Sequence, residues 1–167
     1  MRVAVYVLML GSAVMAVAGG SSMLPKVSDD LQRVVTYDEL RLGGLLSSGS
    51  RFELTVSTAP YNANVELKTF WGNDSDKPTT LLRTLEVLVD GKRVQFPRKA
   101  TEDLCDINLP GRVHLMQSAD ELFVYLGGGD AAGAYTAVLR IIGGHVVSRE
   151  IRFINASGDQ DVVTETY

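Results

Sequence analysis

The segment from Gly127 to Ala132 has the residue types and spacing of a nucleotide-binding motif. It satisfies the pattern G-x-G-x-x-A, and Glu150 follows about 20 residues later, as in dinucleotide-binding folds. Glycines at these positions let the backbone approach a pyrophosphate at the start of a helix. However, the motif lies too close to the C-terminus for the rest of such a fold. We therefore interpret it as a flexible or tightly bent strand connection, and no cofactor is expected.

Cys105, Asp106 and His114 are residues from which a thiol nucleophile and its base could be built. The thiol must contact the imidazole directly, yet Pro110 and Gly111 separate Cys105 from His114 in the chain. A lone cysteine is more often part of a hydrophobic core, and we prefer that interpretation. Because the chain has one cysteine, no intramolecular disulfide can form. A buried thiol and an intermolecular disulfide remain as alternatives.

The histidines and clustered oxygen ligands do not have the spacing of a metal site. His114 and His145 are the only histidines, whereas a zinc site takes three or four nitrogen or sulfur ligands. Oxygen ligands that calcium could use occur together at Asn73, Asp74, Ser75 and Asp76. This run lacks the glycine and the terminal glutamate of a helix-loop-helix calcium site, so we expect a solvated turn. No metal is predicted.

The first eighteen residues have the order of a secretory signal peptide. Arg2 supplies a positive charge, residues 3–17 carry none, and residues 16–18 form a small-residue cleavage site before Gly19. The apolar run is shorter than the roughly 20 residues that cross a bilayer, so no transmembrane anchor is expected after cleavage. We therefore predict a protein exported to the periplasm or to the cell exterior.

The composition argues against one class of partner. The chain has 16 basic and 20 acidic residues, and loss of Arg2 with the signal peptide would make it more acidic. A nucleic-acid binder normally has a basic surplus or a basic stripe, so no nucleic-acid partner is expected. The length that remains after cleavage is sufficient for one domain with its own hydrophobic core.

From Arg51 onward, hydrophobic residues alternate with polar residues, as in half-buried strands. Turn residues separate these strands, which predicts a mainly β fold with a single antiparallel, sandwich-like domain. One short helix is expected from Pro97 to Leu104, with proline at its first position. The predicted organisation is a signal peptide (1–18), a lead-in segment (19–50), the β domain (51–156) and a C-terminal tail (157–167).

A first hairpin is predicted at residues 90–91, an Asp-Gly dipeptide that favours a two-residue turn. This turn pairs Val87 with Val94. Further from the turn it pairs Leu85 with Phe96. All four side chains then lie on one face, which is the test of a consistent register.

A second hairpin is predicted around residues 143–145. We expect a three-residue Gly-Gly-His loop, because it keeps the hydrophobic residues on one face. The same pairing favours strand over helix for residues 132–142. Arg149 is then the exception on the apolar face. The predicted pairs are Ile141 with Val147, Ala137 with Ile151, and Tyr135 with Phe153.

The predicted function is an exported, non-enzymatic binding or protein-interaction module of the cell envelope or exterior. Its partner would be an envelope protein or a surface polymer. Loops on a rigid sheet usually carry binding. The candidate binding residues are therefore Gly127, Gly128, Gly129 and Asp130 in one loop and Asn73, Asp74 and Asp76 in another. The alternative is an exported hydrolase, with an acid and a base drawn from carboxylates such as Glu102, Asp103 and Asp106.

Overall fold

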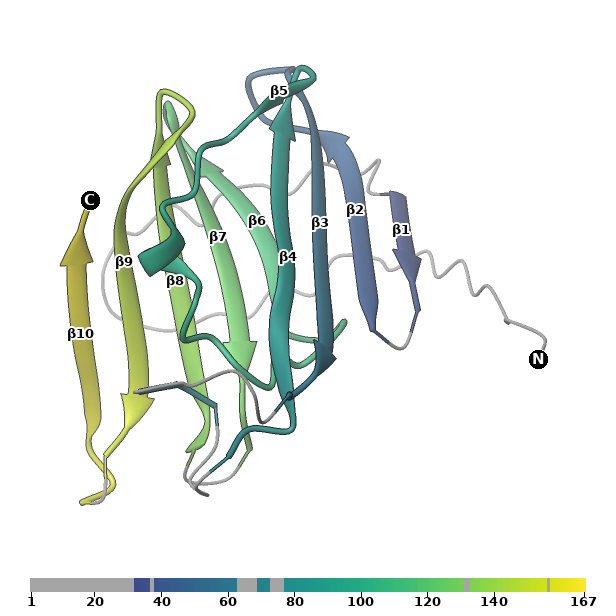
Figure 1. Ribbon diagram of the computed structural model, residues 1–167. Coiled ribbons are helices and arrows are strands. Elements are labelled where there is room, and N and C mark those ends of the chain that lie inside the picture. The colour runs from purple at the N-terminus through teal and green to yellow at the C-terminus, as the bar shows by residue number, and fades with distance from the viewer. Residues whose placement is uncertain (1–31, 37, 63–68, 73–76, 131–132, 156) are drawn as a thin grey trace, which may run out of the picture.

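A computed structural model describes most of the chain after residue 31 (Figure 1). The described residues are 32–36, 38–62, 69–72, 77–130, 133–155 and 157–167. The predicted signal peptide lies outside them, and so does the loop containing Asn73, Asp74 and Asp76.

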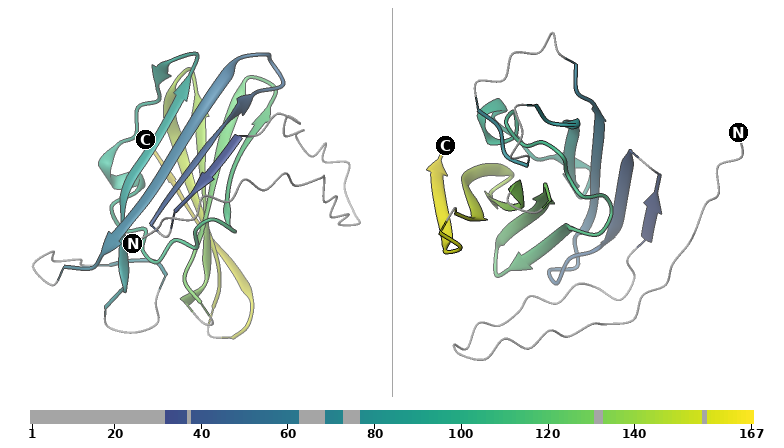
Figure 2. Two further views of the ribbon diagram at one scale, coloured as in Figure 1. Left: turned by 90° about the vertical axis from the view of Figure 1, so that its right-hand side faces the viewer. Right: turned by 90° about the horizontal axis from the view of Figure 1, so that it is seen from below.

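The described residues form two antiparallel sheets, each with five strands (Figures 1 and 2). The first sheet has the order β1-β2-β3-β4-β5, with β1 (Gln32–Val35), β2 (Glu39–Leu45), β3 (Arg51–Pro60), β4 (Thr80–Val89) and β5 (Lys92–Arg93). The second has the order β10-β9-β8-β7-β6, with β6 (Val113–Ser118), β7 (Glu121–Gly128), β8 (Tyr135–Ile142), β9 (His145–Ile154) and β10 (Gln160–Thr166). The predicted mainly β, sandwich-like fold is therefore confirmed.

One hydrophobic core lies between the two sheets. Alternation along each strand sends every second side chain inward, so that apolar residues of both sheets meet there. Residues 132–142 were predicted as strand rather than helix, and β8 confirms this for Tyr135–Ile142. The fully buried core side chains include Leu40, Leu54, Val56 and Val87 of the first sheet and Val124, Leu126, Leu139 and Ile151 of the second.

The strands extend beyond the range 51–156 that the sequence analysis assigned to the β domain. β1 and β2 lie in the predicted lead-in segment, and β10 lies in the predicted C-terminal tail. Gly43 and Gly44 of that lead-in segment lie inside β2 and pair with Glu53 and Phe52 of β3. The wider sheet forms because strand pairing uses backbone groups, which glycine supplies as well as any residue.

The first hairpin has the predicted two-residue turn, with positive φ at Asp90 (49°) and Gly91 (75°). The amide of Val94 donates to the carbonyl of Val87 (2.9 Å), as the predicted register requires. The predicted pair of Leu85 with Phe96 is wrong. The chain leaves the first sheet after Val94, and the next amide, that of Gln95, donates to the carbonyl of Gly144 in the turn between β8 and β9 (2.8 Å).

The second hairpin has a two-residue turn rather than the predicted three-residue loop. Gly143 and Gly144 both have positive φ (57° and 81°), the backbone conformation that such a turn needs. Ile141 pairs with Val146, so the predicted pair with Val147 is wrong. A bulge next to this pair absorbs the extra residue. The predicted pairs of Ala137 with Ile151 and of Tyr135 with Phe153 are confirmed.

Residues 94–112 cross from the first sheet to the second and contain one turn of 3-10 helix, η1 (Arg98–Ala100). The predicted helix from Pro97 to Leu104 is therefore too long. Helical geometry ends at Thr101, which has φ of −140°. Beyond it, Leu104 and Cys105 form bridges with Trp71 and Leu81, which require extended backbone.

Candidate functional site

The three glycines predicted as a binding loop are buried. Gly127 and Gly128 belong to β7, and Gly129 follows with a φ of 70°. The amide of Gly129 donates to the carbonyl of Asp106 (2.9 Å), which ties this turn to the crossover segment. Asp130 is exposed. The three glycines therefore contribute to packing and leave little surface to a partner.

The packing of Tyr135 explains why glycine occupies position 128. A Cβ atom at Gly128 would lie 2.4 Å from Cε1 of Tyr135 and 2.7 Å from its hydroxyl oxygen. The ring is 2% exposed, and its hydroxyl donates to the carbonyl of Cys105 (3.0 Å). The glycine run is thus a close approach between β7 and the Tyr135 ring, which supports the tightly bent connection of the two alternatives that the sequence left open.

Cys105 is a buried, protonated thiol. Its exposed fraction is 0%, and burial, with a smaller contribution from the charge of Asp106, raises its pKa from 9.0 to about 12. A nucleophilic cysteine requires the opposite shift toward a thiolate. Of the two alternatives left open by the sequence, the structure supports the buried thiol.

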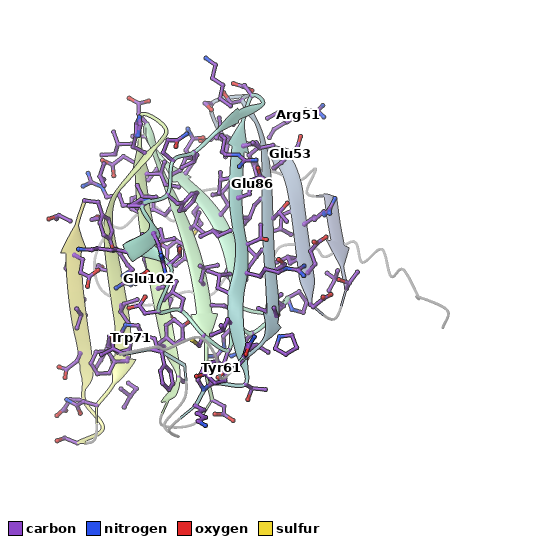
Figure 3. All side chains as sticks on the ribbon, in the orientation of Figure 1. Arg51, Glu53, Tyr61, Trp71, Glu86 and Glu102 are labelled. Atoms are coloured by element: carbon purple, nitrogen blue, oxygen red, sulfur yellow. The ribbon has the colours of Figure 1, made fainter. Side chains whose placement is uncertain are left out.

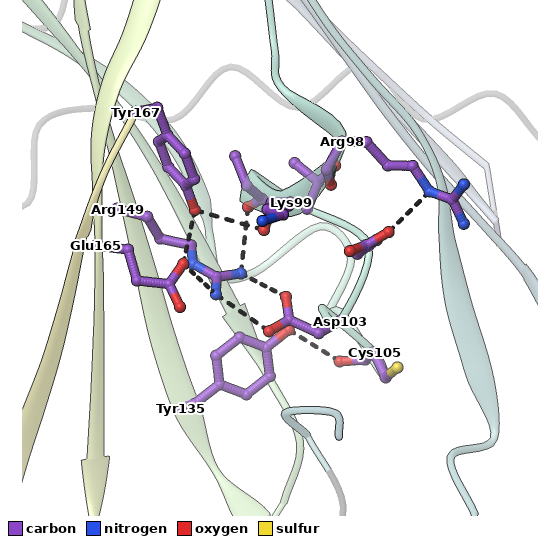
Figure 4. Close-up of polar contacts among 11 residues, drawn as sticks. Arg98, Lys99, Asp103, Cys105, Tyr135, Arg149, Glu165 and Tyr167 are labelled. Carbon is purple, nitrogen blue, oxygen red and sulfur yellow. Dashed lines mark hydrogen bonds and ion pairs between the residues drawn. The ribbon is translucent and has the colours of Figure 1, made fainter. Parts of the chain in front are cut away.

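The carboxylates considered for a hydrolase are engaged in three separate contacts. Glu102 forms an ion pair with Arg98 one turn away (2.7 Å). Asp106 accepts hydrogen bonds from the amides of Thr79 (3.0 Å) and Thr80 (2.7 Å), which fixes the start of β4. Asp103 pairs with a buried arginine of β9, shown in Figure 4.

That arginine is Arg149, the charged residue that the sequence placed on the apolar face. It is 3% exposed, and its guanidinium forms a double hydrogen bond with the carboxylate of Asp103. The same group donates to Glu165 of β10 (2.8 Å), which also accepts from the hydroxyl of Tyr167 (2.8 Å). Figure 4 shows these contacts converging beside η1. We call Asp103, Arg149, Glu165 and Tyr167 the C-terminal clasp.

The clasp fixes β10 to the rest of the molecule. Burial alone would lower the pKa of Arg149, but the hydrogen bond and charge of Asp103 outweigh it, so that its pKa is raised and the guanidinium stays charged. An arginine that is buried and paired in this way is costly to separate from its partners. The C-terminal strand is therefore tied to the crossover segment through Arg149, although it lies at the edge of the sheet.

Trp71 packs against the core. Its ring lies 5.0 Å from the ring of Phe153 in a tilted arrangement, and its backbone forms a bridge with Leu104. Figure 3 shows Trp71 beside β9, near the end of the sandwich that also holds Tyr61. Trp71 is half-buried, so it shields the lower part of β9 from water.

Exposed hydrophobic side chains gather at the C-terminal edge of the second sheet. Six large hydrophobic residues are exposed in the described part of the chain, and four of them lie in β10 or directly beside it. Val162 is 52% exposed and Ile154 is 53% exposed. This surface was not predicted from the sequence, which indicates a tail for residues 157–167. The four residues are Ile154, Val162, Val163 and Tyr167.

β10 is also the longest strand at a sheet edge among the described residues. β1 has four residues and β5 has two. β6 has six, but the turn after β2 lies against it, where the hydroxyl of Ser47 and the amide of Ser48 donate to Gln117 (2.7 and 3.1 Å). β10 has seven residues and neither proline nor lysine, and the charged residues that guard this edge, Asp161 and Glu165, are both acidic.

Comparisons with protein-family models, curated proteins and solved structures found no match. Within the described residues, no group of three or more histidine, cysteine or acidic side chains is placed to hold a metal ion. The same residues contain no helix that is long and apolar enough to cross a membrane. The geometry of the C-terminal edge is therefore the main guide to function.

Proposed function

We propose that this protein is an exported, non-enzymatic interaction module that binds a partner protein at the C-terminal edge formed by β10. The observation that carries the proposal is the concentration of exposed hydrophobic residues on an open edge strand. Hydrophobic patches on a folded surface often mark interaction sites. Here Val162 and Val163 are 52% and 39% exposed and lie on opposite faces of the edge strand, so a partner that pairs with this edge can contact both.

The C-terminal clasp supports this proposal because it organises the edge before any partner binds. Arg149 ties Glu165 of β10 to Asp103 of the crossover segment. A partner that binds a rigid strand does not have to order it, which reduces the entropic cost of association. A strand without such an anchor would lose this advantage.

Substitution of Val162 tests the proposal. The mature chain, from Gly19 to Tyr167, would be immobilised and exposed to a solubilised envelope fraction of its own cell after mild cross-linking. We expect one envelope protein to be retained in stoichiometric amount and lost with Val162→Ser. The matched control is Leu45→Ser, which changes a residue of similar exposure (41%) in the other sheet. A partner retained equally by both variants would refute the proposal.

The export part of the proposal has its own test. The full chain would be produced in a bacterial host, and the protein outside the cytoplasm would be analysed by N-terminal sequencing. We expect it to begin at or near Gly19, because Ala16-Val17-Ala18 has the form of a signal-peptidase site. A full-length chain confined to the cytoplasm would refute export and leave the interaction surface to be tested separately.

A further inference from the structure

We infer that the partner binds by strand addition: an extended segment that carries basic and apolar residues in alternation pairs with β10 as a sixth strand of the second sheet. This inference rests on the proposed function, because it specifies how the same edge binds and which partner it fits. Strand addition derives affinity from backbone hydrogen bonds and specificity from alternate side chains.

The hydrogen bonds around β10 show which backbone groups face outward. The amide of Asn155 donates to the carbonyl of Asp159 (2.8 Å), and the amide of Tyr167 donates to the carbonyl of Val147 (3.0 Å). Bonding residues alternate along an antiparallel strand, so the odd-numbered residues of β10 bond to β9. Their even-numbered neighbours direct both the amide and the carbonyl away from the sheet. These neighbours are Gln160, Val162, Thr164 and Thr166.

The outward backbone groups have no partner within the part of the chain that the structure describes. β10 is the terminal strand in the order of its sheet, and Figure 1 shows it in yellow at the edge of the molecule. An added strand would therefore find about four residues with amides and carbonyls already in strand geometry. The clasp holds these groups in place, so the edge resembles a preformed template.

The charges of this edge favour a basic partner. Asp159 and Asp161 lie along it together with Glu165, whose charge is paired with Arg149 of β9, and residues 155–167 contain no lysine or arginine. Asp161 and Glu165 share one face of β10, while Val162 lies on the other face. A strand with lysine on the first face and valine on the second would complement both.

The same charges disfavour a second copy of this chain as the added strand. Two β10 edges would bring Asp159 and Asp161 of both chains together, four carboxylates, without a basic residue from residues 155–167 of either chain. Like charges on adjacent strands destabilise pairing. We therefore expect the mature protein to be a monomer in solution, as measured by sedimentation velocity.

Synthetic peptides test the recognition. The probe is a seven-residue peptide that alternates valine and lysine, which matches β10 in length. Its controls are the same peptide with glutamate in place of lysine and a version methylated at every second backbone nitrogen. We expect the lysine peptide to bind at least tenfold more tightly than either control. Equal binding by the lysine and glutamate peptides would overturn the basic specificity, and full binding by the methylated peptide would overturn backbone pairing.

A proline substitution tests the same inference from the side of the protein. Thr164→Pro removes one outward amide hydrogen and leaves the bonds between β10 and β9 in place. Thr164→Val changes the side chain and keeps the amide, so it serves as the matched control. We expect the proline variant to bind the lysine peptide at least tenfold more weakly and the valine variant to bind within about twofold of the wild type. Thermal unfolding of both variants checks that each is folded.

The two proposals fail in different ways. If Thr164→Pro keeps full affinity for the lysine peptide, strand addition is overturned, even where Val162→Ser has lost the envelope partner. The partner would then contact the side chains of β10 and not its backbone, and the proposed function would stand. The inference would also be overturned if the wild-type protein were a dimer and Thr164→Pro made it a monomer. The strand that is added to β10 would then come from a second copy of this chain.

Discussion

Replacement of Gly128 by alanine is the sharpest test of how the second sheet packs. The added Cβ would lie 2.4 Å from Cε1, 2.7 Å from Cζ and 2.7 Å from the hydroxyl of Tyr135, and all three distances are too short for carbon contacts. The ring must therefore move. Because it is 2% exposed and packed in the core, it has no empty space to enter.

The expected cost follows from two effects. Overpacking of a filled core destabilises by about 1–3 kcal/mol. Displacement of the ring also breaks the hydrogen bond from the Tyr135 hydroxyl to the carbonyl of Cys105, which adds about 1 kcal/mol. We therefore expect Gly128→Ala to lower the free energy of unfolding by about 2–4 kcal/mol.

Urea unfolding of the mature chain, followed by circular dichroism, measures this change. The control is Gly111→Ala, because a Cβ at Gly111 would meet nothing within 4 Å. We expect the control to stay within about 0.5 kcal/mol of the wild type. If Gly128→Ala were as stable as Gly111→Ala, the interpretation of the glycine run as a packing element would be wrong. Gly127, Gly128 and Gly129 would then again be candidates for a binding loop.

Two other sites give further predictions. Asp103→Ala leaves the guanidinium of Arg149 with Glu165 as its remaining carboxylate partner. We therefore expect this variant to lower the free energy of unfolding in urea by about 2–3 kcal/mol. Arg149→Met removes the buried charge itself and should lower it by less. The thiol of Cys105 should not react with a thiol reagent at pH 8 until the protein is unfolded, and non-reducing electrophoresis should show a monomer. Burial raises the pKa of Cys105 from 9.0 to about 12. Between pH 9 and 12 the folded protein therefore keeps the proton of this thiol, whereas the unfolded chain loses it. The free energy of unfolding should therefore fall between pH 9 and 12, and more steeply than in Cys105→Ala.

Much of the fold could be predicted because two local signals agree with each other. Alternation of apolar residues identified strands between Arg51 and Ile154 but not β1, β2 or β10, and the Asp90-Gly91 dipeptide fixed the first register as far as Val87 and Val94. The bulge in the second hairpin was not predictable, since a two-residue turn with a bulge and a three-residue loop give the same pairs at Ala137 and Tyr135.

The candidate site was less predictable, because its features depend on contacts between distant segments. Gly127 to Gly129 resembled a surface loop, and only the position of Tyr135 shows why glycine is needed there. Arg149 did give a signal, as a charged residue on an apolar face, but its partner Asp103 lies 46 residues away. β10 has no clear alternation, because adjacent Val162 and Val163 are both exposed at the edge.

Hydrogen exchange of single amides in β10 tests the central claim most directly. In the free protein, the amides of Val162 and Thr164 should exchange rapidly, while that of Val163, which bonds to β9, should be protected. Addition of the valine-lysine peptide should slow exchange at Val162 and Thr164 and leave Val163 unchanged. Exchange at Val162 and Thr164 that stays fast while the peptide is bound would contradict strand addition at this edge.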